Sequence, residues 1–461
     1  MGGRVYHDAV GSRSVFYHLD QPLCIASHDE LIAELLGSSV DSLAQALQDE
    51  PEHRNRGVVY LPGDLSMHNG IRALLPNHFY DISTRKALRY WPRAEREQTT
   101  LDQFYSAADE YFDSFASYLA NDFTPILSLT GGVDSRLLVA AFKQHSSQVK
   151  YVTWADQGVP DHELPRITEL SSYLEGEHKF IRATANSDEA SFSRIKDVSA
   201  KGAGHFTRPS PRTANMCRIY KDLFSPIFIP GLAGEVIRGF YNTSKRPIES
   251  ATVAELVRAY STRLSFPSPS DRYLNLVSQA VEQSMLHAEY EGLEKYGYDV
   301  NDLYYWESRV GMWASSTLNK MDPAMLSMTG FNNRRLFASA FGLRPEERLN
   351  KDLFLNLIRR YDAGLADIQI AESIDPAKRL KRQLESQREK NASLSAELER
   401  RENIINELHA ERREKDLELN KLKEERTQSD SSYPNNQQNL GWRSKLPMRK
   451  LLSTLKKAAQ K

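Results

Sequence analysis

An apolar segment runs directly into a pair of glycines at Pro125-Ile126-Leu127-Ser128-Leu129-Thr130-Gly131-Gly132-Val133-Asp134-Ser135. The residues before Thr130 predict a short buried strand, and those from Ser135 to Gln144 favour a helix. A second strand is expected at Val149 to Trp154. Strand, loop, helix and strand at these lengths form a βαβ unit. The sequence therefore predicts an α/β fold with a parallel sheet and flanking helices.

The loop between this strand and helix has the chemistry of a phosphate site. Gly131 and Gly132 allow a phosphate chain to approach the backbone amides, and the following helix points its free N–H groups at the anion. The hydroxyls of Thr130 and Ser135 can add donors. Asp134 would repel phosphate unless it binds a Mg²⁺ ion that bridges the oxygens. The Walker pattern is absent, because no Gly-Lys-Ser/Thr follows.

The loop resembles the SGGxDS loop of the ATP pyrophosphatases, and residues 100–370 are similar to the ATP-pyrophosphatase domain of asparagine-synthetase-like proteins. The resemblance implies an adenine nucleotide α-hydrolase-like fold that binds ATP and Mg²⁺. It places Leu129 and Trp154 beside the adenine. The residues that it implies for nucleotide binding are Leu129, Thr130, Gly131, Gly132, Asp134, Ser135, Trp154, Pro230 and Gly231.

A second loop, within 227–241, looks like the family's SGDGADELFGGY segment. Glu235 falls on its second acidic Mg²⁺ ligand, so the resemblance implies a metal held by Asp134 and Glu235, and a catalytic role for Glu235. Two positions depart from the family. Leu232 stands where the family has the first Asp of the loop, which puts the natural reaction in question. Arg238 replaces an aromatic residue and could itself reach a phosphate or a carboxylate.

Three further segments follow the family's order. Residues 156–163 look like its Gly-x-Pro-Asp-Glu stretch, and Lys351 would correspond to its catalytic lysine. Glu307 and Arg309 lie in a segment similar to divergent synthetase homologues. They could equally form a solvated ion pair on the surface of a helix.

Residues 1–95 mix short β-type runs, such as Val58 to Leu61, with one helical segment near Glu30 to Leu36, which predicts a small α+β unit. This region resembles the later part of the family's glutaminase domain, in truncated form. Those glutaminases use a Cys after the initiator Met as nucleophile, and Gly2 stands there. We therefore expect no glutamine hydrolysis: free ammonia or another amine supplies the nitrogen, or the region is only structural.

The C-terminal part has a different composition. Residues 377–426 contain no glycine or proline, and an unbroken heptad seam predicts a coiled coil and a homo-oligomer. A single solvated helix is the alternative. A polar linker is expected at 428–441. The tail at 442–461 has no acidic residue and could lie on an anionic membrane surface, or serve only as a basic tail.

The composition of the chain limits the classes of function. With 461 residues, 40% hydrophobic, and a formal net charge of -1, the chain can form two or three domains and shows no overall bias towards nucleic acid. No run approaches the ~18 apolar residues that span a bilayer. The default expectation is a cytoplasmic location, with peripheral contact at the inner face of the membrane through the tail as an alternative.

Together these patterns predict an ATP-dependent ligase that adenylates a carboxylate, releases pyrophosphate and lets an amine attack to form an amide. A scaffold with a vestigial nucleotide fold, acting through its coiled coil and tail in an envelope-associated assembly, is the alternative. Modification of tRNA is a third hypothesis. It would favour a reactive cysteine and a basic face near the loop, and neither is evident.

Overall fold

The computed structural model divides into two units, Met1–Ser373 and Ile374–Lys461, and each is described by itself. The residues described are 3–21, 23–54, 56, 58–155, 163–181, 211–241, 252–261, 269–349 and 351–370, with 395, 398–418, 420–421 and 424 in the second unit. The predicted stretch at 156–162, the linker at 428–441 and the tail at 442–461 lie outside these residues.

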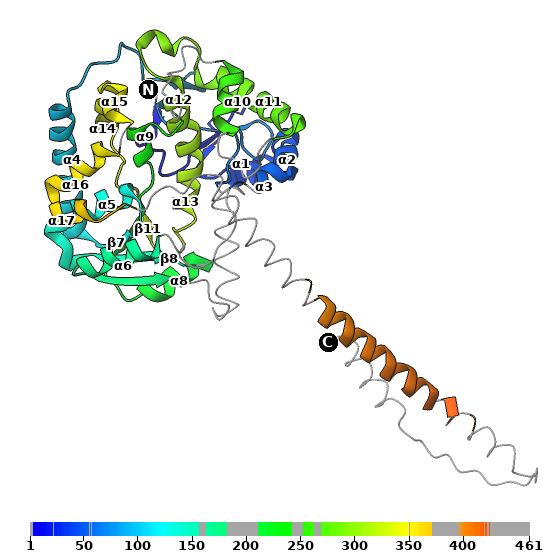
Figure 1. The fold of residues 1–461 in the computed structure, drawn as a ribbon. Helices are drawn as coiled ribbons and strands as arrows, with labels where there is room; N and C mark the ends of the chain where they lie inside the picture. The colour runs from blue at the N-terminus through cyan, green and yellow to red at the C-terminus, as the bar shows by residue number, and fades with distance from the viewer. Residues whose placement is uncertain are drawn as a thin grey trace, which may run out of the picture. The chain divides into compact units, whose positions relative to one another are not determined.

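The first unit contains a five-stranded parallel sheet in the order β11-β10-β7-β8-β9, of which β7, β8 and β11 are labelled in Figure 1. This confirms the predicted α/β architecture, and the two strands expected from sequence lie within one residue of their predicted positions. The strands are β7 (Thr124–Ser128), β8 (Lys150–Trp154), β9 (Glu177–Ile181), β10 (Pro226–Ile229) and β11 (Leu326–Ser327).

Successive residues of a strand point to opposite faces of the sheet, and both faces of this sheet are covered by packed side chains. On β7, Leu127 belongs to the large core that includes Phe112 and Leu137. Its neighbour Ile126 belongs to a smaller core with Met216 and Tyr220 of α8. The helices that supply these cores are α4 (Leu101–Asp122), α5 (Val133–Ala141), α8 (Pro211–Tyr220), α14 (Arg334–Gly342) and α16 (Asp352–Tyr361).

Helix α4 has a well-defined start. Thr100 accepts a hydrogen bond from the backbone of Gln103, whose side chain bonds back to Thr100 as a capping box. Phe104, Phe112 and Leu119 on its buried side lie in the large core. Further helices of the first unit are α6 (Leu164–Tyr173), α9 (Gly234–Arg238), α15 (Pro345–Arg348), α17 (Ala363–Asp367) and the 3₁₀ turns η1 (Lys143–Gln148) and η2 (Leu293–Tyr296).

The N-terminal region is the predicted small α+β arrangement, built on two three-stranded antiparallel sheets. Val58 to Leu61 do not form the predicted strand: Tyr60 and Leu61 are buried by packing instead of strand pairing. The elements are β1 (Arg4–Tyr6), β5 (His78–Asp81) and β6 (Lys86–Arg89), then β3 (Ile25–Ala26), β2 (Phe16–His18) and β4 (Ile71–Ala73), with α1 (Asp29–Leu36), α2 (Ser42–Asp49) and α3 (Pro51–Arg54).

A continuous helical stretch from Val300 to Asn319 joins this region to the sheet. It consists of α12 (Val300–Tyr304), a central π-helix η3 (Tyr305–Ala314) and α13 (Ser315–Asn319). π-Helical turns are rare and are found frequently at functional sites. Two long helices, α10 (Val253–Ser261) and α11 (Asp271–Ala288), pack against each other beside it.

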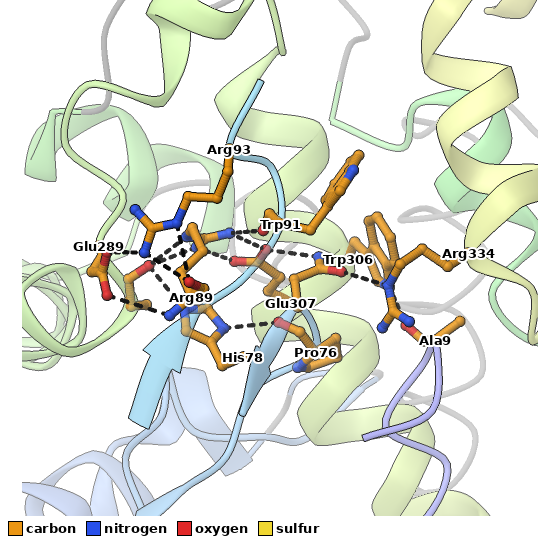
Figure 2. Close-up of polar contacts among 12 residues, drawn as sticks. Ala9, Pro76, His78, Arg89, Trp91, Arg93, Glu289, Trp306, Glu307 and Arg334 are labelled. Atoms are coloured by element: carbon orange, nitrogen blue, oxygen red, sulfur yellow. Dashed lines mark hydrogen bonds and ion pairs between the residues drawn. The ribbon is translucent and has the colours of Figure 1, made fainter. Parts of the chain in front are cut away.

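A buried ion pair anchors the N-terminal region to η3. Arg89 donates to both carboxylate oxygens of Glu307, at 2.6 and 2.7 Å, and both side chains are fully buried (Figure 2). Asn77 donates to the same carboxylate at 2.8 Å. Trp306 donates its indole N–H to the carbonyl of Ala9 at 2.6 Å. Glu307 is therefore a structural anchor, and the alternative of a solvated pair with Arg309 is wrong.

In the second unit, residues 398–418 form a helix whose described side chains are exposed. This helix lies within the segment 377–426, and both the coiled coil and the association of chains remain predictions. Within the part of the chain that the structure describes, no helix combines the length and apolar character that crossing a bilayer requires.

Candidate functional site

The topology of the sheet creates a crevice between β7 and β10. From β7 the chain continues to β8 and β9 on one side, and then returns to β10 on the other side. The loops at the carboxyl ends of these two strands therefore diverge from neighbouring positions. Such a switch point is where open α/β sheets bind their ligands.

The first loop follows β7 and ends at the start of α5. Gly132 is the N-cap, so the free N–H groups of the first turn face the crevice with the positive end of the helix dipole. The hydroxyls of Thr130 and Ser135 lie 2.7 Å apart, and the Gly132 amide donates to Thr130 Oγ1 at 3.2 Å. The turn is thus held in a shape that exposes amides and hydroxyls together.

The second loop follows β10 and packs directly on the first. A Cβ at Gly231 would lie 2.8 Å from the Ser135 nitrogen, and a Cβ at Gly234 would lie 2.3 Å from Asp134 Oδ1. Both distances are below normal contact, so only glycine allows this approach. The close packing of the two loops brings the acidic residues Asp134 and Glu235 into one site.

Arg238 forms an ion pair with Asp134 across the two loops. Its Nη2 donates to Oδ2 at 2.6 Å and its Nε to Oδ1 at 3.2 Å. Burial nevertheless raises the pKa of Asp134, against the opposing effect of Arg238. Burial, together with the charge of Asp134, raises the pKa of Glu235 to about 7. Burial therefore disfavours the charged form of both carboxylates.

These groups line a pocket of about 380 Å³. One wall is aromatic, where Trp154 and Phe228 meet edge to face at 5.7 Å. The lining residues are Ser128, Thr130, Gly132, Asp134, Ser135, Trp154, Phe228, Pro230, Gly231, Leu232, Glu235, Trp313, Thr317, Lys320 and Met321.

Most of the site residues expected from sequence lie in this pocket. Three do not line it. Leu129 is fully buried in the large core, and its carbonyl accepts a hydrogen bond from Thr153 at 2.6 Å. Gly131 is a buried residue of the loop itself. Lys351 is an exposed residue at the N-cap of α16.

Sequence reasoning missed the wall supplied by the end of η3 and by the segment that follows it. Trp313, Thr317, Lys320 and Met321 follow the spacing i, i+4, i+7 and i+8, which places them on one helical face. That periodicity was visible in the sequence. Nothing local, however, indicated that this face would lie against a loop at residue 130.

A larger hollow, of about 570 Å³, lies elsewhere, between α4, η1 and α16. Its cations Arg360 and Lys143 already have protein partners, since Arg360 pairs with Asp109 and Lys143 with Asp362. No glycine is among its lining residues. The pocket at the switch point is therefore the better candidate for a functional site.

Among the described residues, no group of three or more His, Cys, Asp or Glu side chains is arranged to hold a metal ion by itself. No model of a known protein family matches this chain, and no curated protein matches its sequence.

Proposed function

We propose that this chain is an ATP-dependent amide-forming ligase of the asparagine synthase type, with an adenine nucleotide α-hydrolase-like fold and without its own glutaminase. The observation that carries the proposal is the pocket at the switch point, where a helix N-terminus and two carboxylates from separate loops meet. The natural acid and amine are left open.

The phosphate end of the nucleotide is accommodated by groups of positive or donor character. The N-terminus of α5 supplies N–H groups, and Thr130 and Ser135 supply hydroxyls. Lys320 lines the opposite wall and adds a cation. At the other end, the rings of Trp154 and Phe228 offer an apolar surface suited to the adenine.

The two acidic residues fit a magnesium ion that takes its remaining ligands from phosphate oxygens and water. Magnesium in nucleotide sites is usually held by one or two carboxylates plus the substrate phosphates. The raised pKa values of Asp134 and Glu235 support this, because a divalent cation would supply the missing positive charge. When bound, the ion would neutralise the pyrophosphate leaving group.

In the proposed reaction an oxygen of the acid attacks the α-phosphorus of ATP, and the bond to the pyrophosphate oxygen breaks. The products are an acyl-adenylate and pyrophosphate. An uncharged amine then attacks the acyl carbon, AMP leaves, and the amine loses a proton. The proton passes to solvent, because Glu235 would already be engaged with the ion.

The N-terminal region has a structural role in this proposal. Its polar side chains Asn77 and Arg89 are committed to Glu307. In this proposal the N-terminal region supplies no ammonia, and the amine substrate enters from solution.

The test is ATP-dependent stabilisation of the full chain. Binding to the folded state raises the free energy of unfolding by ~2.7 kcal/mol at a ligand concentration 100 times Kd. We expect ATP with Mg²⁺ to raise Tm in wild type and in Asp109→Asn, which changes a half-buried carboxylate paired with Arg360, and not in Asp134→Asn. Pyrophosphate release should then appear with some acid and amine in a panel. If wild type shows no ATP-dependent shift, the proposal fails.

A scaffold function is the second candidate, favoured by the exposed apolar residues of the second unit. Leu398, Ile404, Ile405, Leu408 and Leu417 are 48–64% exposed. Leu398, Ile405 and Leu408 lie on the predicted heptad seam, so a partner helix would cover them. Sedimentation of the full chain and of residues 1–373 should give an oligomer and a monomer; equal sedimentation states would exclude the coiled coil as the oligomerisation element.

A further inference from the structure

The helix of the second unit, residues 398–418, carries an apolar seam that is open to solvent (orange in Figure 1). Leu398, Ile405 and Leu408 lie on the predicted heptad seam, and they are 62%, 51% and 59% exposed. Most of the stability of a helix in a protein comes from packing its apolar face. No described residue covers this face, so it needs a partner helix.

Two cations continue the same seam. Arg412 and Lys415 follow Leu408 in the steps of four and three that define the seam, and both are exposed. Neither side chain forms an ion pair or a hydrogen bond with a described residue. A cation in the apolar seam weakens a coiled coil unless a carboxylate of the partner helix meets it.

An acidic residue stands beside each of these cations in the sequence. Glu411 directly precedes Arg412, and Asp416 directly follows Lys415. Neighbouring residues of one helix point in different directions and do not face each other. By the heptad count Glu411 lies at position g and Asp416 at position e, the two edges of the seam, where a coiled coil forms ion pairs between its helices.

A parallel pair of helices in register brings these charges together. Each side chain of the seam then packs into a hole formed by four residues of the facing helix. At position a that hole includes the partner's preceding g residue, and at position d it includes the partner's following e residue. Arg412 would lie beside the partner's Glu411, and Lys415 beside the partner's Asp416. Long cationic side chains can keep their apolar stems in the seam while their charged ends reach its edge.

Two other features favour the same arrangement. Arg401 occupies a d position and is followed by Glu402, which repeats the order of cation and acid. Ile405 at position a with Leu408 at position d is the combination that favours two strands over three or four.

We propose that two copies of this chain pair through residues 398–418 as a parallel, two-stranded coiled coil. Its register is set by Arg412 against the partner's Glu411 and by Lys415 against the partner's Asp416. The partner is a second copy because both members of each ion pair come from the same stretch of sequence. This inference is independent of the proposed ligase reaction, and it assigns the strand number, direction and register of the predicted association.

The first measurement is sedimentation equilibrium of the full chain and of its charge variants. Wild type should be a dimer. Arg412→Glu places a carboxylate beside the partner's Glu411, and the dimer contains this contact twice, so we expect the Kd of the dimer to rise at least about tenfold. Arg413→Glu is the matched control, because it makes the same change in charge one residue further on, outside the seam. It should change Kd less than about twofold.

The double variant Glu411→Arg/Arg412→Glu distinguishes ion pairs between helices from ion pairs within one helix. Exchanging the two charges restores the contact between helices, so Kd should return to within about threefold of wild type. Within one helix the same exchange puts a cation four residues before Lys415 and a carboxylate four residues before Asp416, and both contacts are repulsive. Weak pairing in the double variant would overturn the proposed contacts.

Cross-linking tests the direction and the register of the pair. In a full chain that carries Cys24→Ser and Cys217→Ser, a cysteine is introduced either as Leu398→Cys, on the seam, or as Leu417→Cys, outside it. The two leucines are similarly exposed, at 62% and 64%. A short bis-maleimide should join two chains of Leu398→Cys and leave Leu417→Cys as single chains. An antiparallel pair would keep the two 398 positions apart, so a dimer without this cross-link would overturn the inference.

The remaining outcomes also decide between explanations. A wild-type monomer at every concentration, a trimer or larger oligomer, or equal cross-linking at the two positions would each overturn the inference. An effect of Arg413→Glu as large as that of Arg412→Glu would do the same, because only the net charge of the helix would then matter. None of these results bears on the proposed ligase function, which is tested separately by the binding of nucleotide.

Discussion

Asp134 and Arg238 are joined by two hydrogen bonds, 2.6 and 3.2 Å long, which tie the first turn of α5 to the last residue of α9. The same carboxylate is the predicted magnesium ligand, so the guanidinium and the ion compete for it. We expect Arg238→Met to tighten the binding of Mg²⁺, in the absence of nucleotide and at pH 8, by roughly tenfold, which corresponds to ~1.4 kcal/mol. Titration calorimetry measures this.

Arg360→Met is the control for the loss of an arginine–aspartate pair, since Arg360 pairs with Asp109 on an exposed surface. It should leave the affinity for magnesium unchanged. Weaker magnesium binding in Arg238→Met would mean that Arg238 orients Asp134 for the ion and does not compete with it.

Replacing Gly234 by alanine should reduce the stability of the fold, whereas replacing Gly132 by alanine should reduce the affinity for ATP. A Cβ at Gly234 would lie 2.3 Å from Asp134 Oδ1, whereas a Cβ at Gly132 would meet only Thr130 Oγ1, at 3.4 Å. Gly132 also has an ordinary φ of -81°. Gly234→Ala should therefore lower the free energy of unfolding by ~1–3 kcal/mol. Gly132→Ala should unfold like wild type and yet lose affinity for ATP, because its methyl group occupies the path of the phosphates.

Urea denaturation and ATP titration on both glycine variants separate the two effects. Normal ATP affinity in a stable Gly132→Ala protein would show that phosphate does not approach this loop.

Replacing only one partner of the buried pair Arg89 and Glu307 should strongly lower the free energy of unfolding. Arg89→Met or Glu307→Gln leaves one buried charge without its partner, and we expect a loss of ~3–5 kcal/mol of unfolding free energy. The double variant Arg89→Met/Glu307→Met should lose less than the sum of the single variants. The exposed pair Arg360 and Asp109 should contribute less than ~1 kcal/mol. Urea midpoints for the two cycles test this, and additive effects at the buried pair would contradict it.

Acid should destabilise the fold through buried histidines. Burial, with a contribution from Arg56, lowers the pKa of His53 from 6.5 to about 3. Between these values the unfolded chain binds a proton that the folded protein excludes, so stability falls as the pH drops from 6.5 towards 3. From this residue alone the loss at pH 5 is ~2 kcal/mol. Burial shifts the pKa of His7 and His78 in the same direction.

The corresponding measurement compares urea midpoints at pH 7.5 and pH 5. His53→Leu should show a smaller loss between the two pH values than wild type. The same substitution at His409, on the exposed helix of the second unit, should leave the loss as it is in wild type. An unchanged difference in His53→Leu would mean that His53 is not the group that titrates.

The sequence predicted the sheet well because the signals for its first strands are local. A short apolar run before Gly131 and Gly132 is enough to predict β7 and the start of α5. The prediction at Val58 to Leu61 is wrong for a related reason: β-type residues alone do not form a strand, and Tyr60 packs against Tyr260 at 5.1 Å instead of pairing in a sheet.

The candidate site was predictable only on the side of its two glycine loops. Lys320 contributes to the opposite wall from a segment far along the chain, and tertiary packing alone brings it there. Leu129 was predicted to line the site, and it does not. It directly precedes the loop, but its side chain is fully buried in the core. The role of Glu307 could not be inferred either, because its partner Arg89 is 218 residues away in the chain.

The π-helix η3 constrains the length of the chain as well as its composition. Glu307 accepts hydrogen bonds from Arg89, and Ser308 Oγ accepts one from the Gly63 amide at 3.0 Å. The guanidinium of Arg309 lies over the ring of Phe240. Three successive side chains therefore make contacts in different directions. Deleting Ser308 would bring Glu307 and Arg309 next to each other and turn one side chain by ~100° relative to the other. The contacts of Glu307 and Arg309 could then not both be kept, even though both side chains were unchanged. For this protein a one-residue gap between Tyr305 and Ala314 is a more severe change than most substitutions there.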